Sequence, residues 1–380
     1  MRMTLVISSL ERGGAERTAS VLANAWAEQG HQVTLITLAR DDAPAYQLHS
    51  AINLRQLRLQ IPGARNILHG IFRQLRIVRV LRSALRQARP DAIVSFMETS
   101  NVLTLLAARG LAAAMIVTEH THPAYVRLGW QWRTLRRLSY HRADALVCMT
   151  GPAWSWFQQR IKVKGCIIPN PVISPALTAR NENQNGDRAK RIAIAMGRLS
   201  REKGFDLLLD AFSTIAGRHP DWSLKILGEG PLRNELETQI RKLNLGGRAE
   251  LAGTVDDPFP LLDDADLFVF SSRFEGFGNA LCEAMACGLP AISFDCPSGP
   301  GEIVRHEVDG LLVPANDVTA LADAMDRLMS NSQERKRLAA RAPEVVTRFG
   351  LASVLGLWDK LFADLLPKTA EEKKTALRES

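Results

Sequence analysis

Residues 266–290 read DLFVFSSRFEGFGNALCEAMACGLP and contain a strand, a glycine-rich loop and a helix in succession. The first seven residues are apolar enough to form a buried strand. A helix is expected to begin near Asn279, with Leu281, Ala284 and Met285 on its packed side. A buried strand that leads through a short loop into such a helix predicts one unit of a parallel sheet covered by helices.

The same alternation of apolar strands and amphipathic helices runs along the chain in two blocks. Strands are expected at residues 3–10, 31–39, 91–97, 114–120 and 144–150 in the first block, and at 192–199, 223–230, 249–255, 266–272 and 290–295 in the second. A proline-rich junction at 169–171 and the polar stretch 178–191 separate the blocks. We therefore expect an α/β protein of two doubly wound, Rossmann-like domains, at 1–170 and 171–350, that face each other across a central cleft.

Length and composition indicate a globular enzyme with more than one domain. The 380 residues exceed what a single hydrophobic core usually serves, and 46% are hydrophobic and 23% charged. Arg109 interrupts the most apolar stretch, 103–117, so no run reaches the about 18 residues of a membrane span. The start of the chain reads as a strand rather than a signal peptide, and a cytoplasmic protein is expected. The five cysteines have neither CxxC nor zinc spacing, so we expect no metal site and no disulfide.

The positive charge is concentrated in the first half of the chain. Residues 1–170 carry 22 basic and 9 acidic side chains, net +13, whereas residues 171–380 carry 26 and 31, net −5. Such a basic half favours an anionic partner. Nucleic acid is not expected, because the basic residues are not interleaved with aromatic ones and no nucleic-acid motif is present. A membrane surface or a phosphate-bearing substrate fits better.

Ligands of doubly wound sheets bind at the carboxyl ends of the strands, and two loops there have suitable residues. Gly13 and Gly14 follow the first strand and open a helix, where the backbone can approach an anion closely, although such a pair also occurs in ordinary turns. Their spacing is not GxGxxG, so a dinucleotide fingerprint is absent. Arg198 and Lys203 follow the first strand of the second block and can neutralise a diphosphate, or simply belong to a solvated basic loop.

Two carboxylates flank the glycine-rich loop of the opening stretch. Glu275 lies in the loop and Glu283 about one turn inside the helix. Backbone N–H groups of 276–278 can turn toward a phosphate at the helix start. Glu283 can then accept hydrogen bonds from a ribose diol, and Glu275 from sugar hydroxyls beyond the diphosphate. An ordinary amphipathic helix explains Glu283 equally well, but it does not explain a Glu in this loop.

In this order, Gly13-Gly14, Gly197-Arg198 with Lys203, GEGP at 228–231 and EGFGNALCE at 275–283 resemble the retaining glycosyltransferases of family 4, which have the GT-B fold. The resemblance covers nearly the whole chain. It implies transfer of a sugar from a nucleotide sugar with retained configuration, and without a metal or other cofactor. It also implies that an amphipathic C-terminal helix, at 351–367, crosses back to the first domain.

The resemblance further assigns roles to individual residues. Arg198 and Lys203 correspond to the residues that bind the donor diphosphate, Glu283 to the ribose ligand and Glu275 to a ligand of the donor sugar. His120 corresponds to the family's active-site histidine, although by itself it fits a polar core position as readily. On this basis the catalytic set is Arg198, Lys203, Glu275 and His120, and the donor-binding set is Gly14, Gly228, Thr254, Gly276, Phe277, Gly278, Asn279 and Glu283.

The stretch 72–89, FRQLRIVRVLRSALRQAR, predicts a basic amphipathic helix. Its apolar residues face the sheet, and its opposite face has five arginines and no carboxylate: Arg76, Arg79, Arg82, Arg86 and Arg89. A charged stripe is often only a solvated face, but solvated helices usually mix both signs. Arginines without acidic neighbours favour pyrophosphate or lipid headgroups as partners.

SSLERGGAER at 8–17, IVSFMETSN at 93–101 and VTEHTHPAY at 117–125 resemble, together with this helix, bacterial enzymes that add N-acetylgalactosamine to undecaprenyl-diphosphate-linked oligosaccharides. This implies a nucleotide-linked hexose or N-acetylhexosamine as donor, with UDP-GalNAc as the first choice because few side chains select the sugar. It also implies a lipid-linked oligosaccharide as acceptor and association with an anionic membrane surface at the inner face of the cell membrane. The acceptor and membrane contacts would be those of Arg76, Arg79, Arg82 and Arg86.

Three other functions are compatible with parts of this pattern. A transferase acting on lipopolysaccharide core or another cell-surface glycan is the closest alternative. Sugar-nucleotide epimerases share the two-domain architecture, but they lack the paired glutamates together with GRLSREKG at 197–204. A noncatalytic nucleotide-sugar-binding protein is disfavoured because every expected site residue is present.

Overall fold

The computed structural model describes the chain except residues 40–42, 60–66, 126–127, 174–189 and 367–380. The chain divides into two compact units. Unit 1 is Met1–Pro169 together with the segment that starts at Val354, and unit 2 is Asn170–Ser353. Each unit is an α/β structure built on one parallel sheet.

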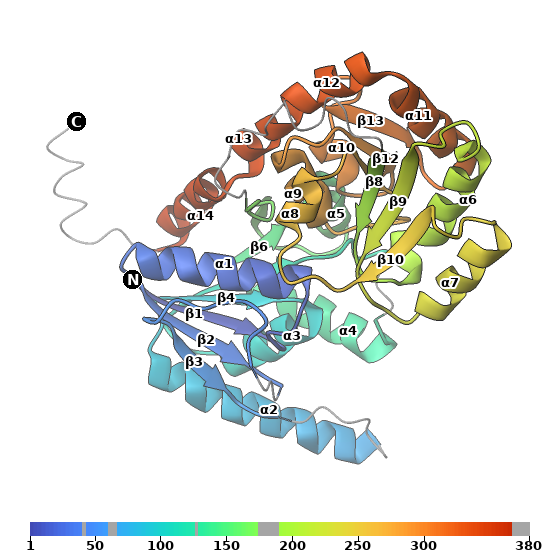
Figure 1. Cartoon of the computed structure of the whole chain (residues 1–380). Helices are drawn as coiled ribbons and strands as arrows, with labels where there is room; N and C mark the ends of the chain where they lie inside the picture. The colour runs from blue at the N-terminus through green and yellow to red at the C-terminus, as the bar shows by residue number, and fades with distance from the viewer. Residues whose placement is uncertain (40–42, 60–66, 126–127, 174–189, 367–380) are drawn as a thin grey trace, which may run out of the picture. The chain divides into compact units, whose positions relative to one another are not determined.

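Unit 1 has a parallel sheet of seven strands in the order β3-β2-β1-β4-β5-β6-β7 (Figure 1). The strands are β1 (Arg2–Ile7), β2 (Gln32–Thr37), β3 (Asn53–Gln56), β4 (Ala92–Phe96), β5 (Ala114–Glu119), β6 (Ala145–Cys148) and β7 (Gly165–Ile167). β4 and β6 are buried at every residue, which explains why their residues, apart from Ser95, are apolar rather than alternating. The strand order reverses between β1 and β4, and ligands of such sheets bind at this switch point.

Helices cover both faces of this sheet. They are α1 (Gly14–Glu28), α2 (Ile67–Ala88), α3 (Glu98–Ala107), α4 (Trp130–Ser139), α5 (Gly151–Gln158), the short η1 (Tyr140–Arg142) and α14 (Leu351–Leu365). α1 lies on one face and α2 on the other (Figure 1). Trp26 of α1 packs edge-on against Trp358 of α14 with ring centroids 5.5 Å apart, so the last helix belongs to the core of unit 1 from Val354 onward.

Unit 2 has a parallel sheet of six strands in the order β10-β9-β8-β11-β12-β13. The strands are β8 (Arg191–Met196), β9 (Trp222–Leu227), β10 (Ala249–Gly253), β11 (Leu267–Phe270), β12 (Ala291–Asp295) and β13 (Gly310–Pro314). The helices are η3 (Arg201–Lys203), α6 (Phe205–Ile215), α7 (Arg233–Lys242), α8 (Phe259–Asp263), α9 (Asn279–Ala286), α10 (Pro300–Ile303), α11 (Val318–Ser330), α12 (Ser332–Arg341), η4 (Ala342–Glu344) and α13 (Val345–Phe349). Here the order reverses between β8 and β11, so these two strand ends form the switch point.

Each of the ten strands expected from the sequence is present. Three further strands, β3, β7 and β13, were not expected. They are three to five residues long and lie toward the sheet edges, where a short segment gives little periodicity to read. The expected helix at 72–89 begins earlier, at Ile67.

Candidate functional site

The switch point of unit 2 brings Lys203 and Glu275 into contact. Nζ of Lys203 lies 2.6 Å from Oε1 of Glu275, and Oγ of Ser272 donates to the same oxygen at 2.6 Å. The two residues come from the loops that follow β8 and β11, 72 positions apart in the chain. Both side chains are largely buried, so this ion pair is less screened by water than a surface pair.

Gly197 makes room for the lysine. A Cβ atom built on Gly197 would lie 3.3 Å from Cδ and Cε of Lys203, so the aliphatic part of the lysine passes directly over this glycine. The ammonium group lies 5.7 Å from the centre of the Phe270 ring, within range of a cation–π interaction. Arg198, the next residue along, is exposed. The loop after β8 therefore holds the Lys203 cation in place and leaves Arg198 exposed to solvent.

Backbone contacts join the two loops. The Arg273 N–H donates to the Glu202 carbonyl at 2.7 Å, and Oγ of Ser271 donates to the Lys203 carbonyl at 2.9 Å. Gly204 has a φ of 63°, and a Cβ atom there would lie 2.0 Å from the Ser271 carbonyl oxygen. Only glycine allows this approach, which fixes Lys203 relative to Glu275.

Arg273 and Asp206, which were not predicted from the sequence, reinforce this junction. The guanidinium group of Arg273 donates to both carboxylate oxygens of Asp206, at 2.7 and 2.6 Å, and to the Arg201 carbonyl at 2.9 Å. Burial favours a higher pKa for Asp206, but the hydrogen bonds and charge of Arg273 outweigh it and hold the pKa below its ordinary value. Two features of the sequence could have identified this pair: an arginine at the start of the glycine-rich loop and an aspartate three residues after Lys203.

Glycines bring three neighbouring strand ends together at the same edge. A Cβ atom on Gly228, after β9, would lie 1.9 Å from the Gly197 carbonyl oxygen. The Gly228 N–H donates to the Gly253 carbonyl at the end of β10, at 2.7 Å. Thr254 follows directly and is exposed. The predicted residues Gly228 and Thr254 therefore lie at the same sheet edge as Lys203.

The start of α9 forms the other side of this site. Gly276, Phe277 and Gly278 are buried, and Gly278 has a φ of 122° before the helix begins at Asn279. The Phe277 ring packs edge-on against Phe349, with centroids 5.3 Å apart. Its side chain therefore belongs to the core, and only its backbone remains for the predicted role in donor binding.

Asn279 and Glu283 are the side chains that α9 contributes. Nδ2 of Asn170 donates to Oδ1 of Asn279 at 2.9 Å, so a residue of the proline-rich junction orients the first side chain of the helix. Glu283 is only 4% exposed, which limits its access to a ribose diol more than the sequence suggested.

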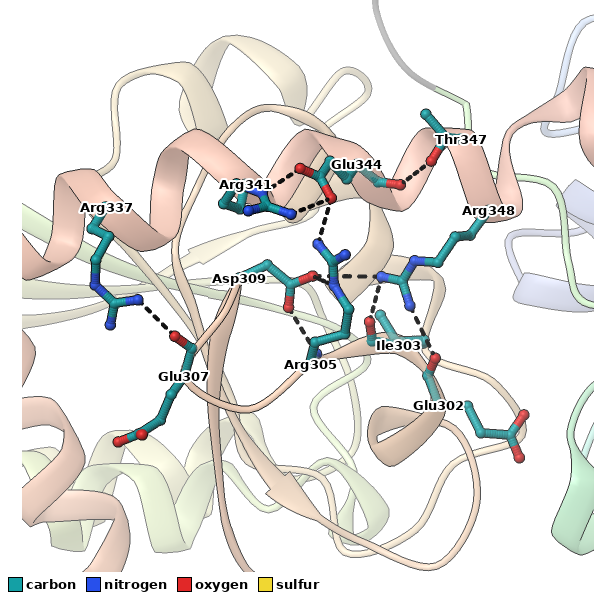
Figure 2. A network of polar contacts seen from close by, with 10 residues as sticks. All are labelled: Glu302, Ile303, Arg305, Glu307, Asp309, Arg337, Arg341, Glu344, Thr347 and Arg348. Atoms are coloured by element: carbon teal, nitrogen blue, oxygen red, sulfur yellow. Dashed lines mark hydrogen bonds and ion pairs between the residues drawn. The ribbon is translucent and has the colours of Figure 1, made fainter.

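A polar network supports α9 from behind. Gly299 has a φ of 98°, and a Cβ atom there would lie 1.9 Å from the Phe277 carbonyl oxygen, so the loop that leads into α10 packs on the glycine-rich loop. Figure 2 shows how Arg348 of α13 holds α10 by donating to the Ile303 carbonyl at 2.6 Å. The fully buried carboxylate of Asp309 accepts from Arg305 at 2.6 Å and lies 3.6 Å from Arg348.

Gly14 and His120 lie in unit 1, at the carboxyl edge of its sheet. Gly14 is exposed and begins α1, and His120 follows β5. His120 is 9% exposed, its ring stacks on Phe96 with centroids 5.3 Å apart, and its Nε2 lies 3.0 Å from Oγ1 of Thr118. Burial lowers the pKa of His120 to about 4, so the imidazole is neutral at physiological pH.

Only part of the expected arginine face is free. Arg76, Arg79 and Arg86 of α2 are exposed. Arg82 is half-buried and donates to the Ala107 and Arg109 carbonyl oxygens, each at 2.7 Å. It caps the carboxyl end of α3, where carbonyl groups lack helical partners, and thus departs from the expected contact with acceptor or membrane.

The exposed side of α4 combines arginines with large apolar side chains. Trp130 is 68% and Leu138 60% exposed, and Arg133 and Arg137 on the same helix are exposed as well. Phe72, in the first half of α2, is 71% exposed. Neither helix contains an acidic residue.

Two kinds of feature are absent from the part of the chain that the structure describes. None of its helices is both long enough and apolar enough to cross a membrane. Nor do three or more His, Cys, Asp or Glu side chains in these residues group together as metal ligands do.

Two family models match the chain. The model described as glycosyltransferase family 4 matches residues 12–173, and the model described as glycosyl transferases group 1 matches residues 178–345. An α-1,4-N-acetyl-D-galactosaminyltransferase from Campylobacter jejuni, whose name specifies a diNAcBac-PP-undecaprenol glycan, is 28% identical over 96% of this chain and 99% of its own. The lipopolysaccharide core biosynthesis glycosyltransferase LpsE from Rhizobium meliloti is 30% identical over 92% of this chain and 96% of its own.

Solved structures agree on the fold. HepE from Anabaena, in complex with UDP, has a TM-score of 0.77 and 20% identity, covering 96% of this chain and 100% of its own. With the two parallel-sheet units described above, this establishes the GT-B fold. The chain belongs to the family 4 glycosyltransferases.

Proposed function

We propose that the protein is a retaining glycosyltransferase that moves a hexose or N-acetylhexosamine, with GalNAc from UDP-GalNAc as the first choice, onto a polyprenyl-diphosphate-linked glycan. The observation that carries the proposal is the Lys203–Glu275 pair, 2.6 Å apart at the switch point of unit 2. The name of the Campylobacter relative, which specifies an undecaprenol-linked glycan, supports the choice of acceptor. The complex of HepE with UDP supports the choice of a uridine nucleotide.

In this proposal the leaving diphosphate is stabilised by protein cations. Lys203 and Arg198 neutralise its charge together with the N-terminus of α9, so that a metal ion is not required. Glu275 accepts hydrogen bonds from hydroxyls of the transferred sugar, and Glu283 binds the ribose. His120, neutral because its pKa is about 4, contacts the sugar as a hydrogen-bond partner rather than as an acid.

The chemical step needs no protein nucleophile. The bond between the anomeric carbon and the diphosphate oxygen breaks, and the acceptor oxygen bonds to the same face of that carbon. The acceptor proton passes to the departing phosphate oxygen, which is the strongest base nearby. Atoms and charge balance, and the catalytic effect comes from cations already in place when negative charge develops.

The acceptor is proposed to be reached at an anionic membrane surface, the inner face of the cell membrane. Arg76 and Arg79 of α2 and the exposed face of α4 support this, because arginines beside exposed Trp and Leu side chains suit the boundary between headgroups and acyl chains. Trp130 and Leu138 supply the apolar part on α4.

Lipopolysaccharide core is the second candidate acceptor. The relative with 30% identity has a name that specifies lipopolysaccharide core biosynthesis. Such a glycan is also attached to a lipid, so the basic and apolar surface of unit 1 does not discriminate between the two.

Mass spectrometry of reaction products tests the proposal. UDP-GalNAc, UDP-GlcNAc, UDP-galactose, UDP-glucose and GDP-mannose are each incubated with undecaprenyl-diphosphate glycans or with lipopolysaccharide core, with and without EDTA. We expect a gain of one N-acetylhexosamine mass on the undecaprenyl glycan, unaffected by EDTA. Transfer only to core favours the second candidate, loss of activity in EDTA contradicts the cation assignment, and interconversion of donors without transfer indicates an epimerase.

A further inference from the structure

Glu98 and His120 follow the neighbouring strands β4 and β5 at the carboxyl edge of the unit 1 sheet. In the register of β4 and β5, Phe96 is paired with Thr118. Glu98 begins helix α3 two residues after Phe96, and His120 directly follows the last residue of β5. Oγ1 of Thr121, the residue after His120, donates to Oε1 of Glu98 at 3.1 Å, which confirms that the two chain segments remain adjacent beyond the sheet.

The hydrogen bonds of Thr118 determine the tautomer of His120. Oγ1 of Thr118 donates its one proton to the Ser95 carbonyl at 2.9 Å, since a carbonyl oxygen only accepts. Its contact with Nε2 of His120, at 3.0 Å, must therefore be donated by the imidazole. Nε2 carries the proton, and Nδ1 is a bare acceptor.

Nδ1 of His120 is buried and has no hydrogen-bond partner among the residues that the structure describes. His120 as a whole is 91% buried. A buried acceptor without a donor costs free energy, about 1 to 3 kcal/mol, which a ligand hydroxyl can recover. The unpaired atom therefore points to a ligand that donates.

Glu98 is a second acceptor at the same edge. It is 7% exposed and is the first residue of the ten-residue helix α3. Met97, just before it, has a φ of 72°, a left-handed conformation that is costly for this residue type. This bend leads from the end of β4, one of the two strands of the switch point, into Glu98.

We propose that Glu98 and Nδ1 of His120 together bind two hydroxyl groups of one sugar ring. A carboxylate and a bare imidazole nitrogen both accept and neither donates, which selects a polyol over a phosphate or a carboxylate ligand. The proposal rests on the proposed function in taking the ring from the donor or from the acceptor glycan, and the experiment distinguishes the two.

The hydroxyls that Glu98 binds are located by combining a Glu98 variant with substrate analogues that each lack one hydroxyl. Glu98→Gln keeps the shape but loses the charge, and we expect kcat/KM to fall about 10- to 100-fold, the usual effect of removing a charged hydrogen-bond partner. The variant and the wild type are compared on monodeoxy analogues of the donor sugar and of the terminal acceptor sugar. For the analogue that lacks the hydroxyl bound by Glu98, the wild type should lose as much activity as Glu98→Gln loses on the full substrate. Glu98→Gln should lose little further activity on that analogue. If the losses multiply for every analogue of both substrates, Glu98 binds no hydroxyl.

Two control variants separate binding from structure. Glu28→Gln alters an exposed carboxylate of α1 and should change neither kcat nor KM. Thr121→Val removes the anchor of Glu98 but not its charge, and it should lower activity less than Glu98→Gln with the same preference among analogues. If Glu98→Gln and Thr121→Val differ in which analogues they still accept, the proposal is overturned.

The tautomer is tested without any turnover. In long-range ¹H–¹⁵N spectra of the full chain, with the His120 signals assigned by their loss in His120→Gln, we expect a protonated Nε2 and a bare Nδ1 from pH 5 to pH 8. A protonated Nδ1 contradicts the proposal whatever the substrate is. Absence of transfer in the product screen, with the expected tautomer present, counts instead against the proposed function.

Discussion

Gly228→Ala is expected to destabilise unit 2 and to weaken UDP binding, because the added Cβ atom has no room. The added Cβ would lie 1.9 Å from the Gly197 carbonyl oxygen, well inside the 3.0 Å that real Cβ contacts keep, and the φ of 136° is itself unfavourable for alanine. The backbone strain costs about 1 to 3 kcal/mol and the forced shift of the neighbouring loop about as much again. Unit 2 should lose about 2 to 6 kcal/mol, or about 5 to 20 °C in Tm. Because Gly197 lies under Lys203, UDP binding should also weaken.

Differential scanning calorimetry and UDP titration of Gly228→Ala check both effects. Gly246→Ala is the matched control, since a Cβ atom at Gly246 has no neighbour within 4 Å. It should leave Tm and UDP affinity unchanged. A Tm for Gly228→Ala within 1 °C of the wild type, with unchanged UDP affinity, would refute the reasoning from close approach, about 1 °C being less than 1 kcal/mol in a unit of this size.

Three further changes have expected outcomes. Replacing Trp130 and Leu138 by Ser should abolish flotation with vesicles of one part phosphatidylglycerol to three parts phosphatidylcholine. The control Ile167→Ser, which alters another exposed residue, should float like the wild type. Equal flotation of the wild type, the double variant and the control contradicts the membrane assignment. Burial raises the pKa of Glu119 from 4.5 to about 8, so the folded state holds a proton that the unfolded state releases, and stability should fall as pH rises from about 5 to 8. Urea unfolding of Glu119→Gln should lack this fall, and parallel profiles would show that Glu119 titrates normally. Arg273→Ala should weaken UDP binding about 3- to 30-fold with a small change in Tm, since it frees the loop that holds Lys203; unchanged binding shows that the loop holds without it.

The fold could be predicted because many of its central strands are buried on both faces. A strand such as β6, with every residue buried, is apolar throughout, and that run is visible in the sequence. β3 and β7 were missed because they are short, polar or edge-lying segments whose pairing is decided by the neighbouring strand rather than by their own residues.

The candidate site could be predicted only where chemistry coincides with a strand end. Lys203 and Glu275 qualified because a cation and a carboxylate follow two buried strands. Arg82 misled, since helical periodicity fixes the face on which a side chain lies but not the carbonyl groups it meets across a helix boundary. Glu98 was missed for a related reason. Its proposed role depends on the pairing of β4 with β5 and on the unpaired Nδ1 of His120, and neither can be predicted from the residues around Glu98.

The central claim is that Lys203 binds the donor diphosphate at the switch point of unit 2. Calorimetric titration with UDP and with uridine tests it most directly, using the wild type, Lys203→Ala and the control Lys242→Ala, which alters an exposed lysine of α7. We predict that Lys203→Ala weakens UDP binding about 10- to 100-fold and leaves uridine binding unchanged, while Lys242→Ala affects neither. Equal UDP affinity in Lys203→Ala and the wild type would contradict the account.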